Sequence, residues 1–334
     1  MKKLKVGIIG TGYLGKLHSK LLVNAENAEF IGVYDLNHEE ALKVAENNGV
    51  TAYEDKAGLI NNADALIVVT PTPTHYEIAR EILLAGKHVF IEKPITDNIE
   101  HARELVNIAS EKNLKIQVGH IERFNPALLA LEKYNLAPLF IQTDRLAQFN
   151  MRGSDVAVVL DLMIHDIDII LSLIKSKVSS INASGVPVVS DNIDIANARI
   201  EFENGAVANV TASRISQKKM RKMRMFQKDA YLSLDFTSGE AEVYRLLNPV
   251  EEKPANYFPL GEMGIADKKR LVIFEKPEIR KVNAMQYEQQ LFIDSVLNDL
   301  RPVVNGEDGL RALRIADMII KKIYENKLIN ELTT

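Results

Sequence analysis

The segment from Asp161 to Asp168 places two carboxylates around a histidine at intervals that suit proton transfer. Asp161 lies four positions before His165 and Asp168 three positions after it, so on a helix the three share one side. A carboxylate beside an imidazole fixes its tautomer and stabilises the imidazolium, as a general base requires. The neighbouring residues are mostly apolar, so these polar groups should be partly buried. The pattern predicts a general base, although a structural core histidine and a His/Asp metal site fit the same spacing.

A second reactive side chain, Lys93, follows the short apolar run 88–91 and precedes Pro94. If this run is a parallel strand, Lys93 lies at its carboxyl end, where α/β sheets bind ligands. A lysine there could donate a hydrogen bond to a substrate hydroxyl and stabilise the oxygen as it becomes a carbonyl. A lysine on a solvent-exposed strand end fits the same position. As a pair, Lys93 and His165 favour the oxidation of an alcohol.

A glycine-rich loop stands between a predicted strand at residues 5–10 and a predicted helix at 13–23. Its residues are Gly10, Thr11, Gly12, Tyr13, Leu14 and Gly15, in the order GxGxxG. The first glycine permits a tight turn, the second lets the backbone approach a diphosphate, and the third lets helix and strand pack closely. Asp35 follows Gly15 by 20 positions, at the end of the second predicted strand, where a carboxylate binds the adenosine ribose. The combination predicts a dinucleotide site, and the alternative is a loop whose glycines only make a turn.

Asp35 also favours NAD as the cofactor. Its charge would repel the additional phosphate of NADP, and the next three residues include no Arg or Lys to neutralise that phosphate. Thr70, Pro71, Thr72 and His75 follow the third predicted strand, on the edge where the nicotinamide should lie. A structural turn explains these four residues equally well, and His75 could instead contact solvent at a helix N-terminus.

The order of the predicted elements divides the chain into two parts. Strands and helices alternate as far as residue 119, which predicts an α/β domain with a doubly wound parallel sheet of the Rossmann type. The later residues predict an α+β domain with an open, largely antiparallel sheet. We expect an NAD-binding domain at 1–122 and a substrate-binding and oligomerisation domain at 123–334. The elements predicted in the second domain are a helix beginning near residue 125, a strand at about 139–146, a helix at 156–174, strands over 181–236 with turns at Asn204–Gly205 and Lys228–Asp229, and helices at 285–297 and 309–324.

The bulk composition excludes several classes of protein. At 334 residues the chain is longer than one hydrophobic core usually grows, and its net charge of −4 gives no basic field for nucleic acid or membrane. The apolar stretch at the N-terminus is too short for a signal peptide, and no other stretch approaches the roughly 20 residues of a membrane span. The chain has no cysteine, which rules out disulfides and thiolate metal sites. We expect a cytoplasmic protein that needs no metal.

Four motifs together resemble the Gfo/Idh/MocA family, the glucose-fructose oxidoreductase and inositol dehydrogenase group, over essentially the whole chain. They are the loop 10–15, the EKP motif Glu92–Pro94, the strand exit Gly119–Phe124 and the segment 161–168. The resemblance implies that Lys93 and His165 are catalytic, that Asp161 contacts substrate and orients His165, and that Glu92 and Lys93 border the cofactor. It also implies a homodimer or homotetramer formed through the second-domain sheet. The chain departs from the family at Met163, where glycine is usual, and at 154–156, which replaces a glycine-rich approach.

Within that family, residues 119–126 and 161–168 most resemble the nucleotide-sugar 3-dehydrogenases that act on UDP-N-acetylglucosamine. This resemblance implies a sugar or nucleotide-sugar substrate and a cation that meets its diphosphate. Arg123 is the predicted substrate contact, and Arg152 or Arg214 could serve the same purpose. The basic run 218–224 could also bind phosphate, or could be a solvated strand face. Two other functions remain open: a non-catalytic NAD- or sugar-sensing protein on the same fold, and a reductase of a non-sugar carbonyl or imine.

Overall fold

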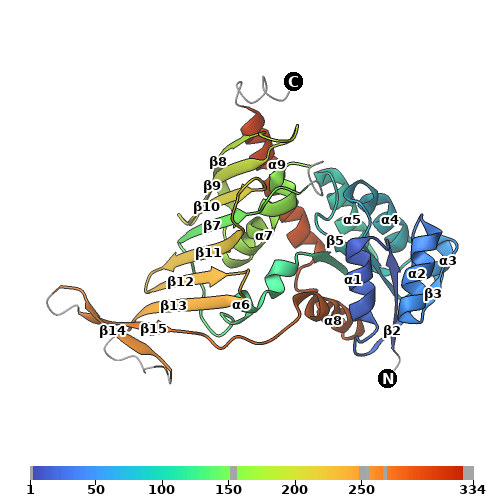
Figure 1. Ribbon diagram of the computed structural model, residues 1–334, viewed down its shortest axis with the longest axis horizontal. Helices are drawn as coiled ribbons and strands as arrows, with labels where there is room; N and C mark the ends of the chain where they lie inside the picture. The colour runs from blue at the N-terminus through green and yellow to red at the C-terminus, as the bar shows by residue number, and fades with distance from the viewer. Residues whose placement is uncertain (1–2, 151–155, 248–253, 255, 266–268, 326–334) are drawn as a thin grey trace. The chain divides into compact units, whose positions relative to one another are not determined.

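The computed structural model describes residues 3–150, 156–247, 254, 256–265 and 269–325 (Figure 1). The chain forms two compact units, one of residues 1–124 and 282–314 and the other of residues 125–281 and 315–334. Residues 282–314 are expected from the sequence in the second domain, whereas in the structure they belong to the first unit. The first unit is therefore assembled from two separate stretches of the chain.

The first unit contains a six-stranded parallel sheet in the order β3-β2-β1-β4-β5-β6. The order reverses beside β1, as in the predicted doubly wound sheet, which is confirmed. β1, β4, β5 and β6 are almost continuously apolar and buried, because helices cover both faces of a parallel sheet. The strands are β1 (Leu4–Ile9), β2 (Ala28–Tyr34), β3 (Thr51–Ala52), β4 (Ala65–Val68), β5 (His88–Glu92) and β6 (Ile116–Gly119).

Side-chain caps define where several helices of this unit begin. Asn37, Asp55, Asn98 and Asn283 each accept a hydrogen bond from a backbone N–H in the first turn of the helix that follows. The last of these caps begins α8, whose Phe292 and Ile293 complete the core around β1 and β5. The helices are α1 (Tyr13–Leu22), α2 (His38–Asn48), α3 (Lys56–Asn62), α4 (His75–Leu84), α5 (Ile99–Glu111) and α8 (Ala284–Leu297), with 3₁₀ turns η1 (Thr72–Thr74) and η2 (Ile121–Phe124).

The second unit contains a nine-stranded sheet in the order β14-β15-β13-β12-β11-β7-β10-β9-β8. Only the β7–β10 pairing among its named strands is parallel, so the predicted open, largely antiparallel sheet is confirmed. The two predicted turns join β9 to β10 and β11 to β12. The strands are β7 (Phe140–Leu146), β8 (Val178–Val186), β9 (Ile195–Phe202), β10 (Val207–Ser213), β11 (Met220–Gln227), β12 (Ala230–Asp235), β13 (Glu240–Leu247), β14 (Phe258–Met263) and β15 (Arg270–Glu275).

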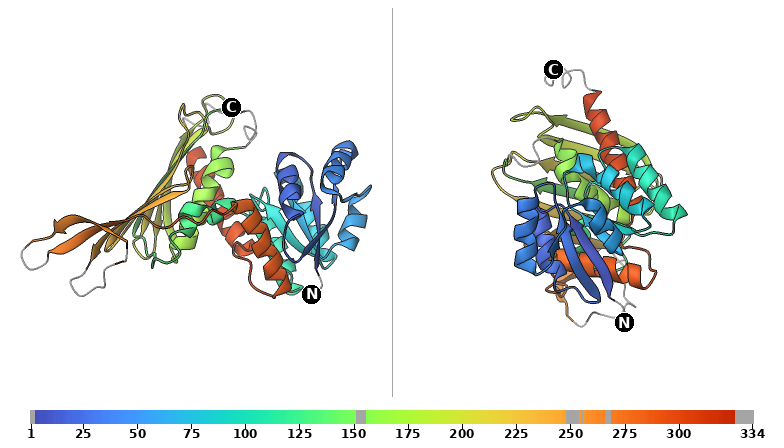
Figure 2. Two further views of the ribbon diagram at one scale, coloured as in Figure 1. Left: turned by 60° about the horizontal axis from the view of Figure 1, so that its bottom comes forward. Right: turned by 90° about the vertical axis from the view of Figure 1, so that its right-hand side faces the viewer.

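The two faces of this sheet differ in what covers them. Within the described residues, α7 and the end of α9 lie over one face, and no helix lies over the other (Figure 2). The burial of the strands alternates accordingly, with Ala198 and Ile200 buried and Arg199 exposed between them. We call the helix-covered face the inner face and the opposite one the outer face. The helices are α6 (Pro126–Leu129), the π-helical turn η3 (Val159–Met163), α7 (Ile164–Leu173) and α9 (Gly306–Tyr324), of which α9 contributes to both units.

Candidate active site

The glycine loop of the first unit joins β1 to α1, and its glycines serve different purposes. Gly10 has a φ of +101°, which favours glycine, and a Cβ there would lie 2.6 Å from the carbonyl oxygen of Val69. A Cβ on Gly15 would lie 2.0 Å from the Gly10 carbonyl oxygen, so this glycine is needed for α1 to approach the loop. A Cβ on Gly12 would meet no heavy atom within 4 Å. The open space at Gly12 is where a diphosphate can approach the backbone.

Asp35, at the end of β2, is held against this loop. One of its carboxylate oxygens accepts hydrogen bonds from the backbone N–H of Thr11, at 2.6 Å, and from the Thr11 hydroxyl, at 3.0 Å. The other accepts a hydrogen bond from the N–H of Asn37 at 2.9 Å. Thr11 therefore anchors the carboxylate, while Tyr13 is exposed and Leu14 packs against the core. The arrangement fits a bound dinucleotide, since both the glycine cradle and the ribose-binding carboxylate are present.

The loops that follow β4 and β5 are tied together by His75. Its imidazole nitrogens lie 2.9 Å from the carbonyl oxygens of Thr70 and Pro94, and the side chain is buried. Burial lowers the pKa of His75, while the two carbonyl contacts raise it in part. Among the predicted cofactor residues near it, Pro71 is exposed and Thr72 is half-buried. His75 thus joins the predicted nicotinamide loop to the backbone that follows Lys93.

Glu92, the last residue of β5, has a buried carboxylate held by protein groups. His18 on α1 contacts it at 2.9 Å through Nε2, and the backbone N–H of Lys93 donates to it at 3.2 Å. Gln289 on α8 donates to Nδ1 of the same histidine at 2.8 Å, which leaves Nε2 as the nitrogen that carries hydrogen. Burial raises the pKa of Glu92, but these hydrogen bonds more than offset it and hold the pKa below its usual value. Glu92 and His18 therefore position the backbone of Lys93.

Lys93 and Arg123 follow neighbouring strands of the first unit. Glu92 on β5 pairs with Gly119 on β6, and both cationic residues come within a few positions of this pair, at the carboxyl edge of the sheet. Both side chains are half-buried. The sheet therefore brings these two predicted substrate contacts to the same edge as the glycine loop.

The second unit carries the other predicted catalytic residues at the start of its long inner helix. Asp161 lies in the π-helical turn η3 and His165 in the first turn of α7, and both are half-buried. π-helical turns are rare and occur frequently at functional sites. The residue after the histidine, Asp166, accepts two hydrogen bonds from Arg145 on β7, at 2.9 and 2.8 Å, and both side chains are buried. This bidentate pair fixes the helix to the sheet beneath it.

Several of these positioning residues are not predicted from the sequence. His18, Gln289 and Arg145 are far in sequence from the groups that they hold, and no local spacing indicates such pairs. Asp166 lies within the predicted motif, but its pairing with Arg145 is visible only in the structure. Arg152 lies outside the described residues. No group of three or more His, Cys, Asp or Glu residues that could hold a metal occurs in the described parts of the chain, and none of the described helices could span a membrane.

Comparisons with known proteins show the family to which this chain belongs. The sequence model of an oxidoreductase family with an NAD-binding Rossmann fold, GFO_IDH_MocA, matches residues 4–120, and the C-terminal domain of the same family matches residues 142–237. UDP-N-acetylglucosamine 3-dehydrogenase of Acidithiobacillus ferrooxidans is 34% identical over 317 residues, covering 95% of this chain and 96% of that protein. This chain belongs to the Gfo/Idh/MocA family. A solved structure of the A. ferrooxidans enzyme, named GnnA, has the same fold as this chain. It superposes with a TM-score of 0.87 at 32% identity and covers 97% of this chain and 99% of that one.

The Gfo/Idh/MocA fold also extends to more distant structures. Levoglucosan dehydrogenase, solved in complex with NADH and L-sorbose, has a TM-score of 0.81 at 20% identity and covers 97% of this chain and 98% of that one. The family model over residues 4–120 and the 34% identity to a dehydrogenase show that this chain is an NAD-dependent oxidoreductase, and the predicted cofactor is confirmed. Gly12, Gly15 and Asp35 are the described residues whose geometry fits that cofactor.

Proposed function

We propose that this protein is an NAD-dependent dehydrogenase that oxidises a ring hydroxyl of a nucleotide sugar, with carbon 3 of UDP-N-acetylglucosamine as the first candidate. One observation carries the proposal: the 34% identity to a protein of that name runs over 95% of the chain. It therefore includes the second unit, which holds His165 and Asp161. Similarity restricted to the dinucleotide-binding unit would carry much less weight, because one fold serves many substrates.

His165 acts as the general base in the proposed reaction. It takes the proton from the sugar hydroxyl while Asp161 orients the imidazole and contacts the substrate. Lys93 donates a hydrogen bond to the substrate oxygen and stabilises it as the C–O single bond becomes a carbonyl. When bound, NAD supplies the acceptor for the hydride that leaves the same carbon. The Gly10–Gly15 loop would hold its diphosphate, and Asp35 would bind the adenosine ribose.

We propose further that the protein is a homodimer or homotetramer joined through the outer face of the nine-stranded sheet. Six aromatic rings form a continuous row on this face, and neighbouring ring centroids lie 4.8–6.2 Å apart. Phe226 and Phe258 are exposed and the other four rings are half-buried. An apolar stripe of this extent, on a face that no described helix covers, favours a protein interface. The β14–β15 hairpin forms one edge of the sheet (Figure 1). It carries further exposed apolar side chains, among them Leu260 and Met263. The members of this outer aromatic row are Phe140, Phe226, Tyr231, Tyr244, Phe274 and Phe258.

A cytoplasmic location is part of the same proposal. The chain contains no cysteine, which suits a reducing compartment.

The experiment is an NADH absorbance assay with purified protein, NAD and four alcohols: UDP-N-acetylglucosamine, UDP-glucose, free N-acetylglucosamine and myo-inositol. A parallel assay follows NADH consumption with keto-sugars and with simple imines. NADH production with UDP-N-acetylglucosamine at the highest kcat/KM supports the proposal.

Three other results would contradict it. A higher kcat/KM for a free sugar or polyol would show that the substrate is not a nucleotide sugar. Dominant NADH consumption with imines or non-sugar carbonyls would favour a reductase. If no substrate changes the NADH absorbance while calorimetry shows normal NAD binding, the result would favour a sensing protein.

A further inference from the structure

A pocket of about 460 Å³ opens on the second unit, where β7 ends and β11 begins. Asp161 of the π-helical turn lies in its lining together with three cationic side chains, those of Arg214, Lys219 and Arg221. Among the described lining residues, Asp161 is the one carboxylate. The pocket therefore joins a predicted substrate contact to an excess of positive charge.

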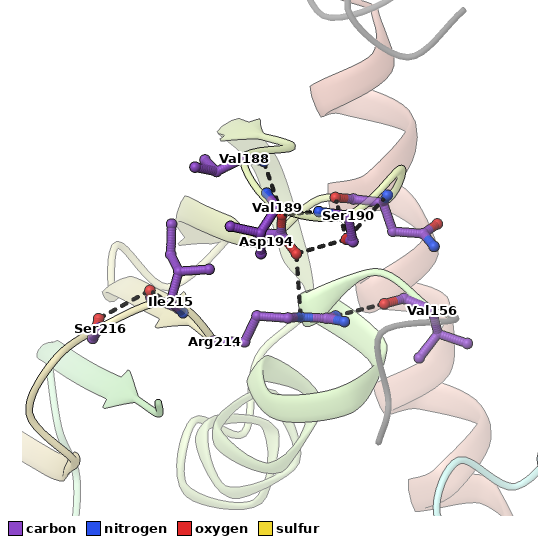
Figure 3. A network of polar contacts seen from close by, with 10 residues as sticks. Val156, Val188, Val189, Ser190, Asp194, Arg214, Ile215 and Ser216 are labelled. Atoms are coloured by element: carbon purple, nitrogen blue, oxygen red, sulfur yellow. Dashed lines mark hydrogen bonds and ion pairs between the residues drawn. The ribbon is translucent and has the colours of Figure 1, made fainter. Parts of the chain in front are cut away.

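Arg214 is committed to the protein itself (Figure 3). Its guanidinium donates a hydrogen bond to the carbonyl oxygen of Val156, and its Nε lies 3.8 Å from a carboxylate oxygen of Asp194. Asp194 is buried and accepts hydrogen bonds from the backbone N–H groups of Val188, Val189 and Ser190. The charge of Arg214 is thus matched by a buried carboxylate, and its hydrogen bond anchors the backbone ahead of η3.

The basic run at 218–224 is divided between the two faces of the sheet. Arg221 lines the pocket and shares the inner face with the buried Met223, while Lys222 lies on the outer face and forms an ion pair with Asp235 at 3.6 Å. Lys219 lies two positions before Arg221, so in an extended segment both side chains point to the same side. Lys219 and Arg221 are both exposed.

Arg145, the cation next to Arg221 on the inner face, has its charge compensated by Asp166. Arg221 on β11 is paired in register with Arg145 on β7. Like charges on opposing strands are unfavourable, but the Arg145 side chain is buried in its bidentate pair with Asp166. Arg145 and Arg214 therefore have buried carboxylate partners, and Lys219 and Arg221 are the exposed cations of the pocket.

We propose that Lys219 and Arg221 form the subsite for the diphosphate of a nucleoside diphosphate-linked substrate. The substrate's sugar then lies toward Asp161 and its phosphates toward the start of β11. Each phosphate carries a negative charge, and cations in a pocket bind such groups through charge-assisted hydrogen bonds. The inference rests on the proposed function, and it assigns to this subsite the discrimination between a nucleotide sugar and a free sugar.

The test measures the affinity for UDP, without turnover, by calorimetry on the full-length protein saturated with NADH, so that the cofactor's own diphosphate site is occupied. The variant K219A/R221A is compared with K218A/R224A, which removes the same two charges from the same run at positions that do not line the pocket. We expect the pocket variant to weaken UDP binding roughly tenfold to a hundredfold for each cation removed, and the control to change it less than about threefold. R221K, which keeps the charge, should retain more affinity than R221A. Thermal melting verifies that each variant is folded.

A kinetic comparison separates this subsite from the rest of the proposed function. In K219A/R221A, KM for UDP-N-acetylglucosamine should rise while the affinity for NAD stays unchanged. Equal UDP affinity in all variants would overturn the subsite and place the diphosphate elsewhere. Absence of UDP binding by the wild-type protein would also overturn it, even if the protein oxidises free sugars and remains a dehydrogenase.

Discussion

Gly12 and Gly15 stand three positions apart in one loop, and an added methyl group would meet different surroundings at each. At Gly15 it would lie 2.0 Å from a backbone oxygen, whereas at Gly12 it would meet open space. Gly12 also has a φ of −62°, which any residue can adopt. The protein itself therefore requires glycine at position 15, whereas we propose that at position 12 the requirement comes from the bound cofactor.

Two substitutions in this loop should therefore fail in different ways. G15A should destabilise the protein by about 1–3 kcal/mol, because the backbone of β1 and α1 must move apart. G12A should change stability by less than about 0.5 kcal/mol, while the methyl group obstructs the diphosphate and weakens NAD binding about tenfold or more. Urea unfolding and NAD titration measure the two effects. Normal NAD affinity in G12A would contradict the placement of the diphosphate.

The proposed base provides a second prediction at this scale. H165N should lower kcat on the order of a hundredfold or more, because general-base assistance is lost. NAD affinity should be retained, since the dinucleotide loop belongs to the first unit. Single-turnover kinetics and NAD titration of the same preparation measure both quantities. A kcat in H165N equal to that of the wild-type protein would contradict the role of His165 as the general base.

At the scale of elements, the segment that leads into η3 and α7 is held in place by the ion pair between Asp194 and Arg214. The loop between β8 and β9 holds Asp194, β10 is followed by Arg214, and the hydrogen bond to Val156 reaches the segment just before η3 (Figure 3). A further backbone hydrogen bond joins Val158 to Ile193 at 2.8 Å. The segment just before Asp161 and His165 is thus held by two other segments, the β8–β9 loop and Arg214 after β10.

The contribution of the Asp194–Arg214 ion pair should appear in D194N as a loss of unfolding free energy that depends on pH. Burial raises the pKa of Asp194, but the backbone donors and the Ser190 hydroxyl more than offset this and lower it overall. A lowered folded-state pKa stabilises the protein above the unfolded pKa of about 4, and this contribution is lost as pH falls through the folded value. The loss of stability in D194N should therefore be about 3 kcal/mol at pH 7 and smaller at pH 3. Urea unfolding at both pH values measures it, and a loss that is independent of pH would contradict the assignment.

Hydrophobic periodicity predicted most elements because it follows burial directly. The predicted helix at 285–297 matches α8 within one residue, and the predicted strands at 5–10 and 88–91 match β1 and β5 equally closely. The two-residue β3 and the short α3 were missed, since so few residues establish no period. The π-helical turn was also missed, because its spacing of polar residues equally fits an α-helix. The division of the basic run between two faces became visible only with the register of β11.

At the scale of the whole molecule, the outer aromatic row predicts how copies of the chain associate. Wild-type protein should be a dimer or larger by size-exclusion chromatography with light scattering. Y231D should shift it toward monomer, because it introduces a charge between Phe226 and Tyr244. L84D introduces the same charge at an exposed leucine on α4 of the first unit and should leave the assembly intact. An unchanged assembly in Y231D would exclude the outer face as the interface.

Because residues 282–314 belong to the first unit, the chain cannot be divided into working fragments at residue 124. Phe90 contacts Phe292 edge to face, with ring centroids 5.9 Å apart, and His18 receives its hydrogen bond from Gln289, so both depend on α8. A fragment ending at residue 124 would expose these groups to water and leave Glu92 with a histidine of undefined tautomer. An independent NAD-binding module would instead require residues 282–314 to be spliced onto 1–124 by a linker. A gene truncated anywhere before α8 would accordingly lose cofactor binding, although its dinucleotide motif would be intact.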